Sequence, residues 1–351
     1  MRGAALKAIL HNMNEFDFIA EILAEGVREG CFPAGVAAVG VGDKILATYA
    51  AGDADLGTRF DMASLTKVLS PTMLALGALE DGVLTLHDPL SLFFDTPADK
   101  ANITVKQLMT HTGGFAPTFL LETETDDPAD AAACILRHPL QYRPGDMACY
   151  SCLGYILLGK VLEAVYTAPL DTLARTRVFM PLGMGRTEYN PSGTNIAPTE
   201  VDPQTGVACC GVVHDENARF LGGVSGNAGV FSDVGDMLRF ASMLATGGGG
   251  FLSPATLRKA IHNYTQGQAV HRGLGFHLAG TPENYMGDLF PNTAFGHTGF
   301  TGTSLAVDPE TGLFAVLLTN RVHPSRANER LFRFRRRFHN KVYASFTRDM
   351  E

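Results

Sequence analysis

The chain has 351 residues, of which 46% are apolar and 18% are charged, and its formal net charge is −8 at pH 7. This composition supplies a sizeable core and excludes a disordered chain. The acidic balance disfavours nucleic acid as a partner, because phosphate binding needs a basic surface. No apolar run reaches the roughly 18 to 20 residues of a membrane span. We therefore expect a globular protein without a membrane span, and its length suggests about two domains.

The N-terminal segment and the cysteines bear on the cellular compartment. The segment MRGAALKAILHNMNEFDFIAEIL is interrupted by polar residues and has no long apolar stretch, so no secretory signal peptide is predicted. The six cysteines, at positions 31, 134, 149, 152, 209 and 210, are too sparse for a disulfide scaffold and are expected to be reduced thiols. These features favour a cytoplasmic location, although an exported form trimmed of its leader would have the same sequence.

The chain begins with a predicted helix and a hairpin. Apolar side chains at helical spacing indicate a helix over residues 15–29. Two β-rich runs follow at 35–41 and 44–51, and the short connection Gly42-Asp43 between them is typical of a hairpin. Residues 64–80 then predict a further helix, which we expect to be kinked at Pro71.

From residue 88 to about 206 the patterns indicate helices and loops, and strands return near the C-terminus. The helical patterns lie at 105–109, 130–137, 154–165 and 170–179. The strand patterns lie at 273–279, 293–297, 303–307 and 313–318, with a turn at 308–312. A last helix is indicated by one apolar face, made of Leu331, Phe334, Phe338, Val342 and Phe346.

These elements predict an α/β protein of the α+β type. Its antiparallel sheet would be flanked by the N- and C-terminal helices, and an all-helical lobe would be inserted between its strands. We expect residues 1–84 and 201–351 to form the sheet-containing lobe and residues 85–200 the helical lobe. The active site is expected between the two lobes.

The tetrapeptide Ser64-Leu65-Thr66-Lys67 carries the first chemical signal. At positions i and i+3 of a helix, Ser64 and Lys67 lie on one face within reach of each other. A serine hydroxyl is a poor nucleophile until a base takes its proton, and a neutral amine held beside it can act as that base. The N-terminus of a helix also favours a developing anion. Alone, the tetrapeptide occurs by chance in many surface helices.

Two further segments give this tetrapeptide a context. Tyr150-Ser151-Cys152 follows the turn Arg143-Pro144-Gly145 and opens a helix, and His297-Thr298-Gly299 ends a late strand. An ordered set of S-x-x-K, a tyrosine triplet and a K/H-T-G triplet is a signature of penicillin-interacting enzymes. The sequence resembles the serine β-lactamase and penicillin-binding-protein-like hydrolases over roughly residues 15–345. The most similar branch holds class C β-lactamases, D-Ala-D-Ala carboxypeptidases, D-aminopeptidases and β-lactamase-like esterases.

Other stretches carry the same resemblance, namely Phe60-Asp61-Met62-Ala63-Ser64, Leu108-Met109-Thr110-His111-Thr112-Gly113-Gly114, Gly222-Gly223-Val224-Ser225-Gly226-Asn227-Ala228-Gly229 and Phe295-Gly296-His297-Thr298-Gly299. The resemblance implies a β-lactamase/transpeptidase-like fold and an acyl-enzyme on Ser64, with no cofactor and no metal. Lys67 and Tyr150 would exchange protons with Ser64, and which of them is the base stays open. The backbone N–H groups of Ser64 and Phe300 would form the oxyanion hole. His297 would act with the catalytic groups, and Thr298, Gly299, Cys152 and His111 would adjoin the substrate.

Two departures from the family pattern concern the substrate. Cys152 stands where the tyrosine triplet usually ends in asparagine, and His297 replaces the lysine of the K-T-G triplet. A histidine is only partly charged at neutral pH and holds a carboxylate less firmly. Both departures resemble the esterase and D-aminopeptidase branches. We expect hydrolysis of small esters, amides or D-amino-acid peptides with weak β-lactam hydrolysis, and a D-Ala-D-Ala carboxypeptidase or a true β-lactamase as the alternative.

Other readings stay open from the residues alone. A domain that is acylated by a ligand without turnover would be a penicillin-binding sensor. The Cys149–Cys152 pair and the adjacent Cys209 and Cys210 could bind zinc, although buried thiols account for them. His111 also fits a structural hydrogen-bonding role at a helix end. The arginine-rich segment 333–337 fits a docked helix with solvated arginines better than an RNA-binding surface. The oligomeric state and the natural substrate are not indicated.

Overall fold

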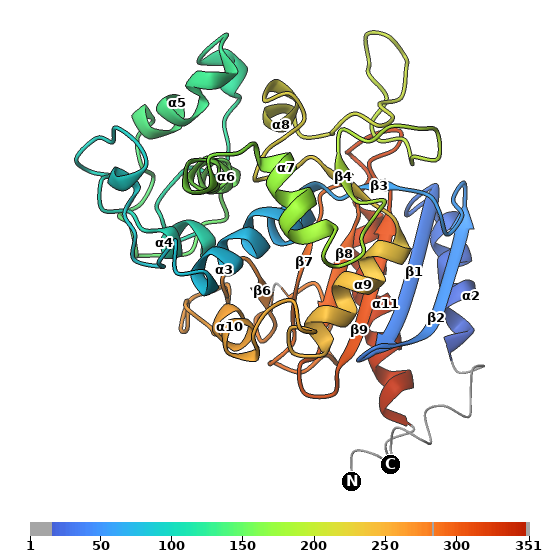
Figure 1. Cartoon of the computed structure of the whole chain (residues 1–351). Coiled ribbons are helices and arrows are strands. Elements are labelled where there is room, and N and C mark those ends of the chain that lie inside the picture. Colours follow the sequence, from blue (N-terminus) through green and yellow to red (C-terminus); the bar gives the residue numbers. More distant parts are fainter. Residues whose placement is uncertain (1–15, 283, 349–351) are drawn as a thin grey trace.

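The main sheet of the computed structural model, which describes residues 16–282 and 284–348, is six-stranded and antiparallel. Its strand order is β2-β1-β9-β8-β7-β6 (Figure 1). The strands are β1 (Ala34–Val41), β2 (Lys44–Gly52), β6 (His277–Leu278), β7 (Phe295–Thr298), β8 (Ser304–Val307) and β9 (Leu313–Thr319). The predicted hairpin of β1 and β2 and the predicted turn between β8 and β9 are both present. The prediction about a signal peptide rests largely on residues 1–15, which lie outside the described residues.

Strand β6 is shorter than the sequence pattern indicates. The predicted strand began at residue 273, whereas β6 begins at His277. Gly275 has a φ of 85°, which is outside the β region and ends the extended backbone at that point.

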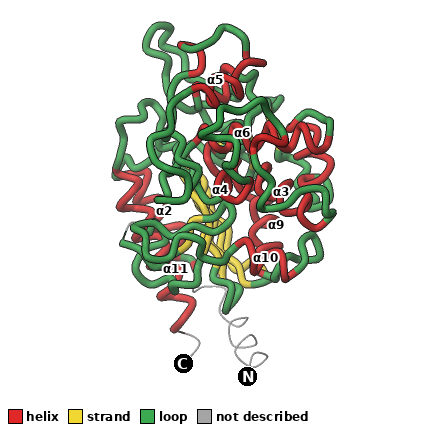
Figure 2. The backbone as a smooth tube through the Cα atoms, turned by 90° about the vertical axis from the view of Figure 1, so that its left-hand side faces the viewer, coloured by secondary structure: helices red, strands yellow, loops and turns green. Residues whose placement is uncertain are grey.

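Both faces of the sheet are covered by helices. Val36 and Ala38 pack on the side of α9 (Val234–Ala245), while Ala37 and Val39 pack on the side of α2 (Phe18–Arg28) and α11 (Arg330–Arg348). Figure 2 shows the strands between these two helical layers. Because both faces are buried, β1 is continuously apolar instead of alternating. The apolar face predicted for the last helix is buried, whereas α9 was not predicted.

The remaining helices pack mainly beside and above the sheet. They are α3 (Met73–Glu80), α4 (Val105–Met109), α5 (Ala131–Arg137), α6 (Cys152–Tyr166), α7 (Leu170–Ala174), α8 (Glu216–Phe220) and α10 (Pro254–Ala260). No single helix within residues 16–282 and 284–348 has the length and apolarity to cross a membrane; one bent pair, Cys152–Tyr166 with Leu170–Phe179, meets those two criteria together. The antiparallel sheet with flanking terminal helices confirms the predicted fold class. The division into lobes at residues 84 and 200 stays a prediction.

The segment that carries Ser64 is less regular than the single kinked helix predicted for 64–80. It begins with a 3₁₀ turn, Ala63–Leu65, continues through a π-helical stretch, Val68–Thr72, and becomes α-helical only in α3. Pro71 lies inside the π-helical stretch, where its missing N–H costs no α-helical hydrogen bond. A second, three-stranded sheet of β3 (Phe60–Asp61), β5 (Val230–Ser232) and β4 (Glu188–Tyr189) leads directly into this segment.

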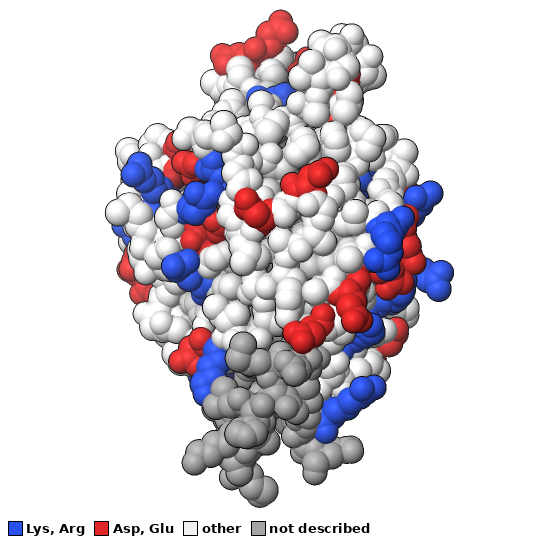
Figure 3. Space-filling view, turned by 90° about the vertical axis from the view of Figure 1, so that its right-hand side faces the viewer, with Lys and Arg blue, Asp and Glu red and all other residues white. Residues whose placement is uncertain are grey.

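Charged residues are dispersed over the surface that Figure 3 presents. On that face small groups of Lys and Arg and of Asp and Glu lie scattered among uncharged residues. Arg337 of α11 forms an ion pair with Glu25 of α2 at 2.8 Å, so α2 neutralises one of the arginines of α11. This face carries no broad basic patch of the kind that binds nucleic acid.

Candidate active site

Ser64, Lys67 and Tyr150 converge at one point of the structure. Lys67 Nζ lies 3.0 Å from Ser64 Oγ and donates a hydrogen bond to the carbonyl oxygen of Asn227 at 2.9 Å. The same nitrogen lies 4.9 Å from the centroid of the Tyr150 ring. Lys67 is fully buried, and Ser64 and Tyr150 are half-buried beside a cavity. The three side chains are therefore placed for proton exchange, although they come from segments far apart in the sequence.

Burial and neighbouring charges set the pKa values of Tyr150 and Lys67. Burial raises the pKa of Tyr150, and the nearby Lys67 ammonium only partly opposes it. Burial by itself lowers the pKa of Lys67, but the negative charge that Cys152 and Tyr150 carry when ionised outweighs burial, so the pKa of Lys67 is raised. If Tyr150 acts as the base, neighbouring cations such as Lys67 are needed to lower its pKa. The pKa of Tyr150 is raised instead, and Tyr150 and Lys67 exchange protons as a coupled pair.

The backbone around Ser64 is held by the carboxylate of Asp61. Asp61 Oδ1 accepts the N–H of Ala63 at 2.8 Å, and Oδ2 accepts the N–H of His214 at 2.7 Å. Ala63 has a φ of 46°, a left-handed conformation that costs energy for a residue with a side chain. Burial raises the pKa of Asp61 to about 6, against the opposing effect of these two N–H donors. In the sequence, Asp61 stands out only as part of the stretch Phe60–Ser64 that resembles the family, so this positioning role is not evident from the sequence.

Strand β7 and the loop after it are tied to the Ser64 segment. Thr301 Oγ1 donates to the carbonyl of Asp61 at 2.6 Å, and Thr303 Oγ1 donates to the carbonyl of Met62 at 3.1 Å. These bonds fix the loop that carries Gly299 and Phe300 against the loop that carries Ser64. The two segments expected to supply the oxyanion-hole N–H groups are thus neighbours, as that role requires.

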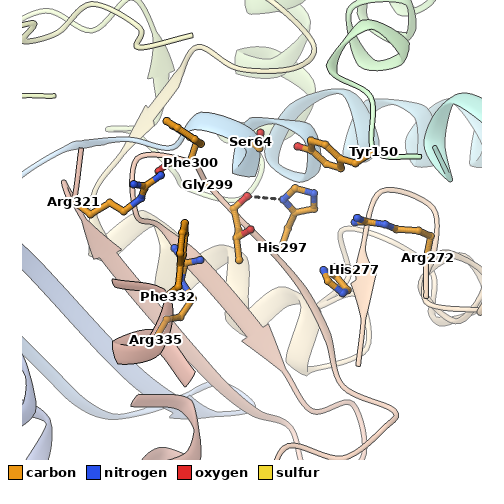
Figure 4. Close-up of a pocket in the computed structure, with 11 residues that line it drawn as sticks. Ser64, Tyr150, Arg272, His277, His297, Gly299, Phe300, Arg321, Phe332 and Arg335 are labelled. Atoms are coloured by element: carbon orange, nitrogen blue, oxygen red, sulfur yellow. Dashed lines mark hydrogen bonds between the residues drawn. The ribbon is translucent and has the colours of Figure 1, made fainter. Parts of the chain in front are cut away.

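Two cavities meet at Ser64, Tyr150 and Phe300. The first has a volume of about 290 Å³ and is also lined by His297, Thr298 and Gly299 of the predicted site, as Figure 4 shows for most of these residues. The second, of about 230 Å³, is lined by Cys152 and by the acidic side chains of Asp215 and Glu216. A substrate bound over Ser64 can extend into both, so an acyl group and a leaving group each have a separate space.

His297 lines the first cavity as a neutral side chain. Its Nδ1 lies 2.8 Å from the carbonyl oxygen of Thr298, and because a carbonyl only accepts, Nδ1 carries the proton. Burial, with the charges of Arg272 and Lys67, lowers the pKa of His297 well below its usual value. The partial positive charge expected from the sequence is therefore absent at neutral pH. The buried Nε2 is left as an acceptor without a protein partner.

His111 and Cys152 both lie near Tyr150. His111 lines neither cavity: its Nδ1 accepts the N–H of Ser151 at 3.1 Å, and its ring centroid lies 4.5 Å from that of Tyr150. These contacts favour the structural hydrogen-bonding role for His111. Cys152 Sγ lies 3.6 Å from Lys67 Nζ and faces the second cavity.

All six cysteines lie within the described residues and are free thiols. Among residues 16–282 and 284–348, no group of three or more His, Cys, Asp or Glu side chains is arranged to hold a metal ion.

Three arginines of the first cavity were not identified from the sequence. Arg272, Arg321 and Arg335 line it, and each is at most 8% exposed. Arg272 lies on the loop before β6, with its guanidinium carbon 5.4 Å from the centroid of the Tyr150 ring. No motif surrounds Arg272 or Arg321 in the sequence. Arg335 lies in the arginine-rich segment 333–337, and the expectation that its arginines are solvated is wrong for Arg335, which is buried against the cavity. Only the folded chain brings the three to Ser64. They give the cavity the positive charge that His297 does not supply.

Comparisons with known proteins agree with this geometry. The model of the β-lactamase family matches residues 19–339. A protein of Escherichia coli (strain K12), named as a proposed D-alanyl-D-alanine carboxypeptidase, is 32% identical over 307 residues, which are 77% of this chain and 70% of the relative. A penicillin-binding protein homologue from Caulobacter crescentus superposes with a TM-score of 0.76 at 18% identity, over 95% of this chain and 98% of that one.

EstCE1, described as a hydrolase with promiscuous acyltransferase activity, superposes with a TM-score of 0.71 at 21% identity, over 97% of this chain and 99% of its own. The family model covers most of the chain, and the carboxypeptidase-named relative is similar over more than two thirds of it. The chain belongs to the β-lactamase family of hydrolases.

Proposed function

We propose that this hydrolase acts through an acyl-enzyme on Ser64. The observation that carries the proposal is the 3.0 Å contact between Ser64 Oγ and the buried Nζ of Lys67, beside the Tyr150 ring and at the meeting point of two cavities. A nucleophile within hydrogen-bond distance of a group that can exchange protons with it, next to space for a substrate, is the arrangement that nucleophilic catalysis requires.

The reaction balances in two steps. Ser64 Oγ attacks the substrate carbonyl while its proton passes to the Lys67–Tyr150 pair, and the N–H groups of Ser64 and Phe300 stabilise the oxyanion. The pair then returns the proton to the leaving amine or alkoxide, which departs and leaves the acyl-Ser64 ester. A water molecule repeats the sequence in the second step, giving the acid and free Ser64.

The charge of the first cavity favours substrates whose leaving group carries a carboxylate. Arg272 lies beside Tyr150, and a guanidinium binds a carboxylate more strongly than the neutral His297 can. The buried Nε2 of His297 has no hydrogen-bond partner among the described residues, so it can accept a hydrogen bond from an N–H or O–H of the same leaving group. A short peptide or amide with a C-terminal carboxylate fits this arrangement, and the names of the carboxypeptidase-like relatives support it. The carboxylate would thus be bound by Arg272 and not by His297, which replaces the lysine of the K-T-G triplet.

The test is a substrate panel run on the intact chain and on Ser64→Ala. The panel compares p-nitrophenyl esters, D-amino-acid amides, D-Ala-D-Ala peptides and nitrocefin, and mass spectrometry follows the covalent adduct. We expect turnover and an adduct only with Ser64 present. Hydrolysis that persists in Ser64→Ala would refute the mechanism. An adduct that forms and never clears would identify a sensor instead of an enzyme.

The role of Arg272 is tested with Arg272→Gln. We expect a rise in KM of at least about tenfold for peptides with a free C-terminal carboxylate, from the loss of a charge-assisted hydrogen bond, and little change for the matching C-terminal amides. Arg258→Gln, at an exposed position of α10, is the matched control. An equal loss for acids and amides would show that Arg272 only supports the fold.

A further inference from the structure

Two of the cavity arginines lie apart from Arg272. In Figure 4, Arg321 and Arg335 stand on the opposite side of His297 from Arg272, with Phe300 and Phe332 beside them. Arg321, which follows β9, is 1% exposed, and Arg335, on α11, is 5% exposed. Both line the cavity that contains Ser64. This pair of buried guanidinium groups has no part in the mechanism described above.

The partners of Arg321 are all uncharged. Its Nε donates to the carbonyl of Phe300 at 3.0 Å, and its Nη1 donates to the carbonyls of Arg326 and Asn328 at 3.1 and 2.7 Å. Its guanidinium carbon lies 4.6 Å from the ring centroid of Phe300 and 5.0 Å from that of Phe332. These contacts fix the orientation of the group and satisfy its Nε and Nη1 donors, but carbonyls and rings do not neutralise its charge.

Arg335 is less completely satisfied. Its Nη2 donates to the carbonyl of Thr303 at 3.3 Å, and its Nε is buried without a partner. Within residues 16–282 and 284–348, neither Arg321 nor Arg335 forms an ion pair. Burial lowers the pKa of Arg335 to about 10; Tyr285 opposes this shift and Arg321 adds to it. The Arg335 guanidinium is therefore still a cation at neutral pH. Burial also lowers the pKa of Arg321, although Glu329 opposes this from beyond ion-pair distance.

A buried cation without a counterion is costly, and its cost falls when an anion binds. We propose that Arg321 and Arg335 form a second anion subsite of the active-site cavity, which binds a carboxylate of the substrate. A structural role explains the bonds of Arg321 but not the unpaired Nε of Arg335, nor the lack of an ion pair at either guanidinium among residues 16–282 and 284–348. Since Arg272 stands on the other side of His297, the substrate class is one with two separated carboxylates, such as a peptide or amide of an acidic amino acid. This inference rests on the proposed function for the position of the substrate.

The subsite is tested by direct binding to the Ser64→Ala chain, in which turnover does not interfere. Calorimetry compares glutarate with butyrate, which has one carboxylate fewer, and with inorganic phosphate. We expect glutarate to bind at least about tenfold more tightly than butyrate, because charge-assisted hydrogen bonds are the strong ones. Arg335→Gln removes this preference, and Arg335→Lys, which keeps the charge, retains part of it. Arg333→Gln, at an exposed position of the same helix, is the control and keeps the full preference.

Equal binding of glutarate and butyrate, or a preference that survives Arg335→Gln, would overturn the proposal. Phosphate binding that depends on Arg335 while glutarate binding does not would also overturn it, because the subsite would then serve a phosphate instead of a carboxylate. If Arg335→Gln loses its cooperative thermal transition, the comparison of Arg335→Lys with Arg333→Gln decides the question. Failure of the Ser64 mechanism is seen separately, as hydrolysis retained by Ser64→Ala, and does not affect these binding measurements.

Discussion

Asp61 is the residue through which the backbone around Ser64 can be tested. It is fully buried, and its two carboxylate oxygens accept the N–H groups of Ala63 and His214. The informative change is Asp61→Asn, which has nearly the same shape and no titratable proton. The amide keeps one acceptor oxygen, so one of the two backbone N–H groups loses its partner. A buried N–H without an acceptor costs about 1–3 kcal/mol, and we expect a constant destabilisation of that size.

The pH dependence of stability separates titration from this constant loss. Burial raises the pKa of Asp61 from 3.8 to about 6, so the folded chain favours the protonated form. The contribution of the raised pKa of Asp61 to the free energy of unfolding is therefore full below pH 3.8 and is lost as the pH rises through 6. At about 1.4 kcal/mol for each tenfold change in proton affinity, the total loss is about 3 kcal/mol. About 2 kcal/mol of it falls between pH 4 and pH 7.5.

The assay is urea unfolding of the natural chain and of Asp61→Asn at a series of pH values from 4 to 7.5. Other groups titrate equally in both proteins, so the difference between the two unfolding free energies isolates Asp61. We expect the natural chain to lose about 2 kcal/mol relative to the variant over this range. A difference that stays constant with pH, or that changes in the opposite direction, would refute the raised pKa and the role of burial in it.

Three further predictions concern the catalytic groups and the close packing behind them. Tyr150→Phe lowers the acylation rate, measured as the rate of adduct formation, by about 10²- to 10⁴-fold. In the natural chain, the pKa values of Lys67 and Tyr150 are raised, so we expect the acylation rate to increase with pH from 7 to 9. A flat pH profile would contradict a proton shared by these two groups. His297→Asn leaves the shape of the kcat/KM profile unchanged between pH 6.5 and 8, since burial lowers the pKa of His297 well below its usual value and keeps it neutral there. The loss of an ionisation in this range would disprove that. Gly226→Ala lowers the free energy of unfolding by about 1–3 kcal/mol, measured by thermal unfolding, because a Cβ would overlap the carbonyl of Tyr155. Gly77 has open space around it, so Gly77→Ala stabilises α3 by up to about 1 kcal/mol. Equal effects of the two glycine replacements would argue against the close contact.

Local patterns in the sequence determined the elements that depend on near neighbours. The hairpin of β1 and β2, the turn before β9 and the apolar face of α11 follow from side-chain spacing and turn residues, and all three are present. Ser64 and Lys67 are three residues apart, so a single helical turn is enough to bring them together. The order of the three motifs then identified the family, which the comparisons confirm.

Only the tertiary structure decided the surroundings of this pair. Asp61 holds the N–H of His214, and Asn227 holds Lys67 from 160 residues away, contacts that no local spacing encodes. Burial is also a property of the whole fold, and it left His297 neutral and raised the pKa of Tyr150, against the expectation from neighbouring charges. Arg272 and Arg321 come from segments without a motif, and the arginine-rich segment 333–337 does not by itself reveal that Arg335 is buried. The sequence therefore placed Ser64 and Lys67 side by side, whereas the protonation of the site and the charge of its cavity arise from long-range packing and the exclusion of water.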